Sequence, residues 1–239
     1  MNPIRIFRHD SWVGAGHFIR TLERNKFSYE LVAIDQGEPV LTDINNVSGL
    51  AFLGGTMSVN DTHPWISEEL NLICRAAEKN LPIIGHCFGA QLISKALGGN
   101  ISTMPKKEIG WHAIEFLDNE ICKQWFSRLP KTLDVLLWHE DAMTIPSGAT
   151  PLYTTVHNPN QAFTIDNIIA TIPHLEVTAN MLNDWLEVYG YDLVPLSDSV
   201  QSEAEISRDL VQRISSMHQL ADVIYDQWLS MLDADLNIL

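Results

Sequence analysis

The sequence predicts an α/β domain with a mostly parallel central sheet, followed by a C-terminal helical extension. Short apolar runs of β-forming residues alternate with longer amphipathic stretches, which is the pattern of strand–helix units. Several runs, such as Leu50-Ala51-Phe52-Leu53, are apolar throughout, as expected for strands covered by helices on both faces. The 239 residues suffice for one large domain or two small ones.

The individual elements follow from this alternation. The expected strands are residues 4–8, 29–34, 49–53, 81–86, 113–117, 133–138, 161–165 and 168–172. The expected helices are residues 16–24, 64–79, 88–97, 120–128, 179–189 and 203–232.

Strand patterns stop near Leu186, and only helical periodicity continues beyond it. We therefore expect a main domain, residues 1–184, and a helical extension, residues 185–239. Apolar residues recur at helical spacing from Ile206 to Leu232, which favours a helix packed on the main domain. A lid or dimerisation element beside a functional site is the alternative.

Charge and composition exclude several classes of function. Acidic residues outnumber basic ones by 30 to 15, giving a net charge of −15, and the longest basic run is Lys106-Lys107, so a nucleic-acid partner is not expected. No apolar run reaches the ~18 residues of a membrane helix, and the N-terminus lacks a signal-peptide pattern. Three cysteines without CxxC spacing support neither disulfides nor a metal site. We expect a cytoplasmic protein that does not bind membranes.

Cys87 is the strongest candidate for chemistry. An apolar strand runs into Gly85-His86-Cys87-Phe88-Gly89 and directly on into an amphipathic helix. This is the nucleophile-elbow pattern with cysteine in the serine position, and its glycines leave room for a sharp turn. The turn places Cys87 at a helix N-terminus, where the dipole and free amides favour a thiolate. Cys74 and Cys122 lie within helical patterns without flanking glycines, and we interpret them as structural.

A cysteine nucleophile needs a proton carrier and a group that orients it. His174 and Glu176 follow the late strand 168–172, at the strand end where α/β sheets place their sites. His139 and Asp141, after the strand 133–138, have the same spacing. The spacing alone does not decide between these two pairs.

Backbone amides for a developing oxyanion have two candidate sources. Gly54-Gly55 ends the strand 49–53, and Gly55 would present one N–H group. Phe88, next after the nucleophile, would present the other. A double glycine after a strand is often only a turn, so its value lies in its combination with Cys87.

Together these residues resemble the class I, triad-type glutamine amidotransferases over nearly the whole chain. In that family Gly-x-Cys-x-Gly-x-Gln holds the nucleophile, matched by residues 85–91, and His-x-Glu completes the triad, matched by His174 and Glu176. Residues 54–59 match the oxyanion loop, and residues 108–111 match a further familiar stretch. The C-terminal region is similar to the stand-alone branch that is GMP-synthase-like.

The resemblance implies a three-layer, flavodoxin-like fold and an amidohydrolase that uses a thioester of Cys87. It assigns Gln91 to glutamine binding and puts His139 and Asp141 near the substrate pocket, outside the triad, with Gly54 also at the substrate. No metal or organic cofactor is implied, and the substrate is glutamine or another γ-glutamyl amide.

Two departures from the family pattern lie beside the triad. Ile172-Pro173 stands where the family has Gln-Phe, and Leu175 replaces a proline. The triad side chains are intact, so we expect the geometry to be retained; the alternative is a weakened or redirected enzyme.

Several functions remain open at this point. The sequence contains no phosphate-binding loop and no pyrophosphatase-type loop, so an acceptor half would lie on a synthase partner or be absent. The alternatives to an ammonia-supplying subunit are a γ-glutamyl hydrolase that works alone, a non-catalytic regulatory protein on the same scaffold, and a cysteine peptidase or chaperone-like protein. The acidic extension shows no second apolar stripe for a partner, so we expect a self-contained hydrolase, with homo-oligomers left open.

Overall fold

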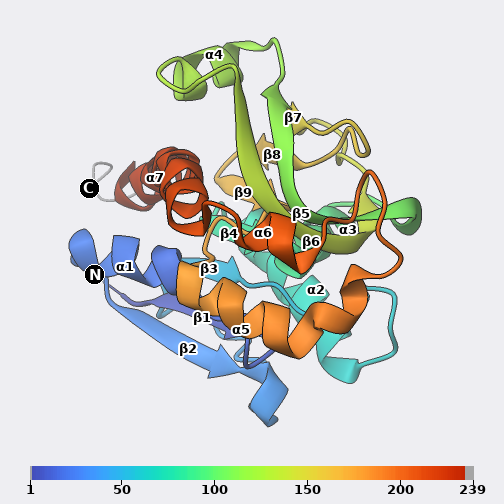
Figure 1. Ribbon diagram of the computed structural model, residues 1–239. Helices are drawn as coiled ribbons and strands as arrows, with labels where there is room; N and C mark the ends of the chain where they lie inside the picture. Colours follow the sequence, from blue (N-terminus) through green and yellow to red (C-terminus); the bar gives the residue numbers. More distant parts are fainter. Residues whose placement is uncertain (1, 235–239) are drawn as a thin grey trace.

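A computed structural model describes residues 2–234 and contains a nine-stranded sheet between two layers of helices (Figure 1). The strand order is β2-β1-β3-β4-β9-β8-β7-β5-β6. The strands are β1 (Ile4–Arg8), β2 (Tyr29–Ala33), β3 (Gly49–Phe52), β4 (Ile83–His86), β5 (Ile101–Phe116), β6 (Thr132–Met143), β7 (Thr150–Thr154), β8 (Ala162–Ile165) and β9 (Ile168–Thr171). Neighbours pair in parallel from β2 through β9 and antiparallel from β9 through β6. The expected α/β class is confirmed.

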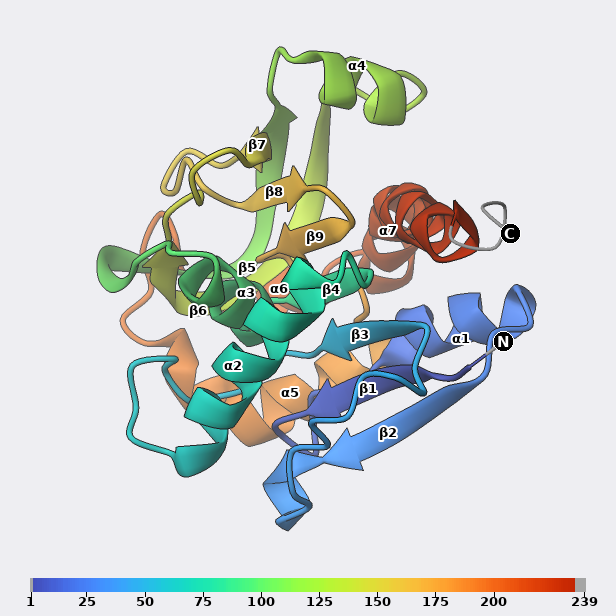
Figure 2. The same cartoon turned by 180° about the vertical axis from the view of Figure 1, so that it is seen from behind.

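Helices cover both faces of the sheet. The helices are α1 (Gly16–Arg24), α2 (Pro64–Glu78), α3 (Phe88–Ala96), α4 (Glu120–Phe126), α5 (Ala179–Tyr189), α6 (Glu203–Ser207) and α7 (Leu210–Ala234), with short 3-10 turns η1 (Ile34–Gln36) and η2 (Gly190–Leu193). Helices α1, α5 and α7 lie on the face seen in Figure 1, and α2 and α3 lie on the opposite face (Figure 2). This arrangement explains why the central strands β3 and β4 are buried along their whole length.

Two expected strands and one expected helix need correction, and one strand was not expected. The strand expected at 133–138 is part of a longer β6, so His139 and Asp141 lie within that strand and not after it. The strand expected at 113–117 is the end of a longer β5, whose polar first half pairs with β6 across a register shift between Thr103 and Glu108. Strand β7 was not expected, because Pro151 lies within it; the strand has room for proline where its pairing with β8 shifts register. The helix expected at 203–232 is two helices, because Asp209 between them has a positive φ of 53°.

The C-terminal helix α7 packs its apolar stripe onto the sheet. Met217, Leu220, Ile224 and Trp228 are fully buried, whereas Val211, expected in the same stripe, is 76% exposed. The expected boundary after residue 184 falls inside α5, so the division into 1–184 and 185–239 remains a prediction.

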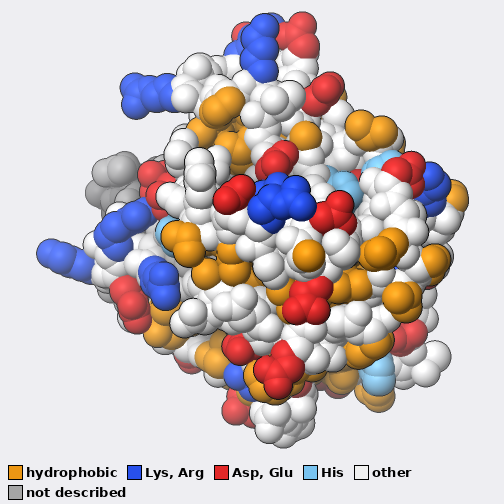
Figure 3. Space-filling model, viewed as in Figure 1, with side chains coloured by type: hydrophobic (Ala, Val, Ile, Leu, Met, Phe, Trp, Pro, Cys, Tyr) orange, Lys and Arg blue, Asp and Glu red, His pale blue; other side chains and the backbone are white. Residues whose placement is uncertain are grey.

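Charged side chains are scattered over the face of the molecule that carries α7, where Lys and Arg side chains lie among acidic and uncharged ones (Figure 3). Between residues 2 and 234, none of the helices has the length and apolar character needed to cross a bilayer.

Candidate active site

Cys87 sits on a strained turn between β4 and α3. Its backbone has φ 48° and ψ −108°, a conformation that costs an L-residue free energy. The turn is sharp enough to exclude side chains at both flanking glycines: a Cβ at Gly85 would lie 2.6 Å from the Gly89 backbone, and one at Gly89 would lie 2.1 Å from the Phe52 carbonyl oxygen. The two glycines therefore have the steric role that the sequence predicts.

The turn directs the Cys87 side chain into a cavity while holding its backbone. The Cys87 N–H donates to the Thr171 carbonyl at the end of β9, 2.9 Å away. The Sγ atom lies 3.8 Å from the Trp138 carbonyl oxygen, and the residue is only 4% exposed. The first amides of α3 follow directly, and helix N-termini leave such donors free for an anion.

His174 faces Cys87 and is held from behind by Glu176. The segment after β9 carries both residues, and the His174 N–H donates to the Leu136 carbonyl at 2.9 Å. His174 Nδ1 lies 2.7 Å from Glu176 Oε1, with both side chains buried. Burial alone would lower the pKa of His174, but the adjacent Cys87 and Glu176 outweigh it and raise that pKa to about 10. Burial likewise works to raise the pKa of Glu176, but His174 and His86 bring it below its usual value. The surroundings of His174 thus favour its protonated form, next to an ionised Glu176.

The rival pair is arranged differently. His139 Nε2 lies 2.9 Å from Glu108 Oε2, and His139 Nδ1 lies 2.9 Å from the backbone oxygen of Asp141. The Asp141 carboxylate accepts hydrogen bonds from Ser58 and Thr103 instead of orienting His139. Both ring nitrogens of His139 are therefore engaged by groups other than Cys87, and the geometry favours His174 as the partner of the thiol.

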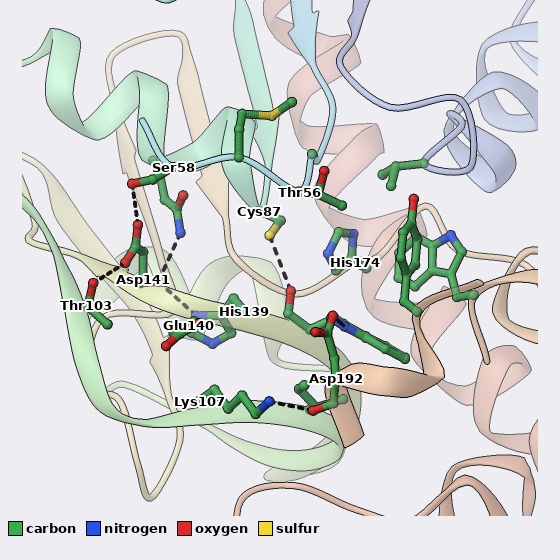
Figure 4. Close-up of a pocket in the computed structure, with 18 of the residues that line it drawn as sticks. Thr56, Ser58, Cys87, Thr103, Lys107, His139, Glu140, Asp141, His174 and Asp192 are labelled. Carbon is green, nitrogen blue, oxygen red and sulfur yellow. Dashed lines mark hydrogen bonds between the residues drawn. The ribbon is translucent and has the colours of Figure 1, made fainter. Parts of the chain in front are cut away.

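A cavity of about 440 Å³ opens above Cys87 (Figure 4). Of the residues singled out from the sequence, six line it: Gly55, Cys87, Gln91, His139, Asp141 and His174. The Gln91 side chain donates to the Asp141 backbone oxygen at 2.9 Å, which fixes its amide beside the cavity.

The remaining three lie behind the cavity wall. Glu176 is fully buried behind His174. Gly54 packs against the imidazole of His174, and the Phe88 ring is fully buried against His9 and Trp65. The side chain of Phe88 therefore makes no contribution to the cavity surface, and only its backbone amide could face the site.

The far wall of the cavity comes from residues that the sequence did not single out. Trp138 Nε1 donates to Asp192 Oδ2 at 3.2 Å, and Lys107 donates to the backbone oxygens of Asp192 and Val194. These bonds join β5 and β6 to η2, two segments that are distant in the sequence. The wall also includes Tyr189, Tyr191 and Trp185, whose indole meets the His174 ring edge-on at 4.8 Å.

No group of three or more His, Cys, Asp or Glu side chains within residues 2–234 is arranged to hold a metal ion. The structure places a thiol, an imidazole and a buried carboxylate next to one another at Cys87, His174 and Glu176, which are the group types that acyl transfer to a thiol requires.

Comparison with known proteins gives a consistent relationship. The family described as "Glutamine amidotransferase class-I" matches residues 16–180. The crystal structure of a glutamine amido transferase from Methylobacillus flagellatus superposes with a TM-score of 0.93 at 32% identity, covering 97% of this chain and 95% of that one.

Curated relatives cover less of the chain. The putative glutamine amidotransferase-like protein YfeJ of Salmonella typhimurium is 25% identical over 185 residues, which are 75% of this chain and 77% of that protein. The glutamine-hydrolysing GMP synthase of Petrotoga mobilis is 35% identical over 102 residues, or 42% of this chain. This chain spans only 18% of that synthase's length.

Proposed function

The chain belongs to the class I glutamine amidotransferase family, and from this we propose that it hydrolyses the side-chain amide of glutamine or a related γ-glutamyl compound. The observation that carries the proposal is the arrangement of Cys87, His174 and Glu176. The thiol sits on a strained turn, the imidazole faces it, and a buried carboxylate 2.7 Å away holds the imidazole from behind.

In the first half of the reaction, the Cys87 thiolate attacks the amide carbon. The backbone amides of Gly55 and Phe88 would donate to the oxyanion, and one such donor commonly contributes about 3–4 kcal/mol to the transition state. His174, protonated beside the thiolate, gives its proton to the departing nitrogen as the C–N bond breaks. Ammonia or an amine leaves, and a thioester between Cys87 and the γ-glutamyl group remains.

In the second half, His174 takes a proton from water, whose oxygen attacks the thioester. The C–S bond breaks, glutamate leaves, and His174 again stands protonated beside the thiolate. Glu176 orients the ring through both steps and stabilises its charged form, consistent with the raised pKa of His174.

We assign substrate binding to the cavity wall. Its volume of about 440 Å³ falls within the range typical of small-molecule sites. Gln91, His139 and Asp141 form one side, and the bonds of Gln91 and His139 to the Asp141 backbone keep that side rigid. We assign Gly54 to the same site, because its lack of a side chain leaves room for the His174 ring.

The likeness to GMP synthases favours one second candidate, an ammonia-supplying subunit of a separate synthase. We prefer a hydrolase that works alone, in which residues 1–184 form the catalytic part and the C-terminal part that begins at residue 185 contributes to the cavity wall. Trp185, Tyr189, Tyr191 and Asp192 line the cavity from this C-terminal part.

The test is glutamate release by the purified chain from glutamine and from a series of γ-glutamyl amines and peptides. We expect Cys87→Ala to abolish release and Cys74→Ala, a matched change of a thiol far from the cavity, to leave it unchanged. Release that persists in Cys87→Ala would overturn the proposal. Release that appears only after a cell-lysate fraction is added would favour the synthase subunit.

A further inference from the structure

A second histidine lies against Glu176, on the side away from His174. This residue, His86, is the last of β4 and directly precedes Cys87. Its Nδ1 atom is 3.4 Å from Glu176 Oε2, and both side chains are fully buried. Within residues 2–234, neither of these two atoms has a hydrogen-bond partner of good geometry. Glu176 therefore has one oxygen bound to His174, and His86 Nδ1 lies 3.4 Å from the other.

The other nitrogen of His86 faces the C-terminal helix. Tyr225, from α7, places its hydroxyl 3.4 Å from His86 Nε2, and the two rings meet edge-on at 5.7 Å. The aromatic ring of Phe18 packs edge-on against the rings of both His86 and Tyr225. The ionisable groups that face His86 are Glu176, His174 and Tyr225.

The protonation states of His86 and Tyr225 follow from their burial. Burial lowers the pKa of His86 and raises the pKa of Tyr225, so the imidazole is neutral and the phenol keeps its proton. A neutral imidazole has one donor and one acceptor. The ionised Glu176 Oε2 can only accept, so the ring proton belongs on Nδ1, and Nε2 is then the acceptor for the Tyr225 O–H.

We propose that His86 and Tyr225 are positioning residues, which hold Glu176 in the orientation that directs His174 toward Cys87. The His86 Nδ1–H holds Glu176 Oε2, and the Tyr225 O–H supports this tautomer by donating to Nε2. A fully buried carboxylate that is hydrogen-bonded through only one oxygen can still rotate, and its second oxygen is poorly solvated. A second hydrogen-bond donor restricts the rotation and replaces the missing solvation. This inference rests on the proposed function, and it extends the working parts of the site to α7, about 140 residues along the chain from the nucleophile.

The test uses three variants of the full chain. His86→Leu removes the ring nitrogens at similar volume, His86→Asn restores an N–H donor near the Nδ1 position, and Tyr225→Phe removes only the hydroxyl. Two readouts apply to each: kcat and KM for glutamate release, and the rate at which iodoacetamide alkylates Cys87 between pH 5 and 9. Peptide mass spectrometry separates Cys87 from Cys74 and Cys122.

We expect His86→Leu to lower kcat about tenfold to a hundredfold, the loss typical for a hydrogen bond to a charged group, with KM changed less than about twofold. Alkylation near neutral pH should slow, because a less well held His174 stabilises less thiolate. His86→Asn should recover most of both losses. Tyr225→Phe should show the same changes to a smaller degree, and it carries the test if His86→Leu does not fold.

The alkylation readout needs no turnover, so this inference can fail independently of the proposed function. If wild-type kcat is measurable and neither His86→Leu nor Tyr225→Phe lowers it, His86 is only a packed core residue. The same conclusion follows if all three variants lose thermal stability in proportion to activity and Asn gives no recovery. If instead Cys87→Ala remains active, the proposed function itself fails, whatever the alkylation profiles show.

Discussion

The imidazole of His174 lies against the backbone of Gly54 with no space between them for a β-carbon. A Cβ atom at residue 54 would stand 2.7 Å from His174 Cε1 and 3.0 Å from Val13 Cγ1. The loop after β3 and the His174 ring are therefore packed as one unit, and the position of His174 depends on the absence of a side chain two residues after β3.

Gly54→Ala tests this packing. The added methyl must displace the His174 ring or its own loop, because it would lie only 2.7 Å from His174 Cε1. We expect kcat for glutamate release to fall at least about tenfold, with a stability loss of about 1–3 kcal/mol from overpacking. Gly190→Ala is the control, since nothing lies within 4 Å of a Cβ there. Equal kcat values for the two variants would contradict the close packing of Gly54 on His174.

Replacement of Cys87 by glycine and by alanine separates strain from chemistry. Both changes remove the thiol, so both should abolish glutamate release. The φ of 48° at Cys87 costs free energy with any β-carbon and little with glycine. We expect Cys87→Gly to be about 1–2 kcal/mol more stable than Cys87→Ala in urea unfolding. An alanine variant as stable as the glycine variant would show that the turn stores no strain.

The pair His139–Glu108 should matter for stability. Loss of His139 leaves the Glu108 carboxylate fully buried without the partner that, against the effect of burial, lowers its pKa. We expect His139→Ala to reduce the free energy of unfolding by about 3 kcal/mol, the usual result of breaking a buried pair. His174→Ala should also reduce stability, because it leaves the buried Glu176 carboxylate without its partner, but unlike His139→Ala it should abolish kcat completely. A fully stable but inactive His139→Ala protein would revive His139 as the base.

The charge pair His174–Glu176 predicts a specific pH dependence of stability. The folded-state pKa of Glu176 is lowered, so its contribution is present above pH 4.5 and is lost as the pH falls through the lowered value. The folded-state pKa of His174 is raised to about 10, so its contribution is complete below pH 6.5 and is lost as the pH rises toward 10.

The stability difference between the wild type and Glu176→Gln should therefore be greatest between pH 4.5 and 6.5 and should shrink in both directions. Urea unfolding of the two proteins at a series of pH values measures it directly. A difference that is constant from pH 4 to 10 would mean that the pair is not charged in the folded protein.

Local patterns sufficed where one segment determines its own structure. Helices α1 and α5 and strand β1 begin and end at the residues expected from periodicity. The turn at Cys87 was also predictable, because Gly85 and Gly89, within the same five residues, indicate that the turn has no room for side chains. The break at Asp209 was not, since neither glycine nor proline marks it and only the φ of 53° reveals it.

Long-range pairings were not accessible in the same way. The spacing of His139 and Asp141 equals that of His174 and Glu176. Only the fold shows that Glu108, on a neighbouring strand, is hydrogen-bonded to the ring of His139. Lys107 and Asp192 meet across 85 residues, and no local pattern predicts that contact. His86 was passed over within the nucleophile motif itself, because its partners come from the segment after β9 and from α7.

The bond between Lys107 and η2 also bears on how such a protein can diversify. The residues to which we assign the reaction follow β3, β4 and β9, whereas the outer wall around residues 185–192 lies on a separate stretch. Lys107 and Trp138 bind this stretch at Asp192, and Trp185 and Tyr189 bind it to the segment after β1. Insertions or exchanges in that stretch would reshape what fits beside the γ-glutamyl group without disturbing the strained turn. In the proposed reaction, selectivity for the leaving amine would therefore belong to a segment that can be exchanged between relatives without changing Cys87, His174 or Glu176.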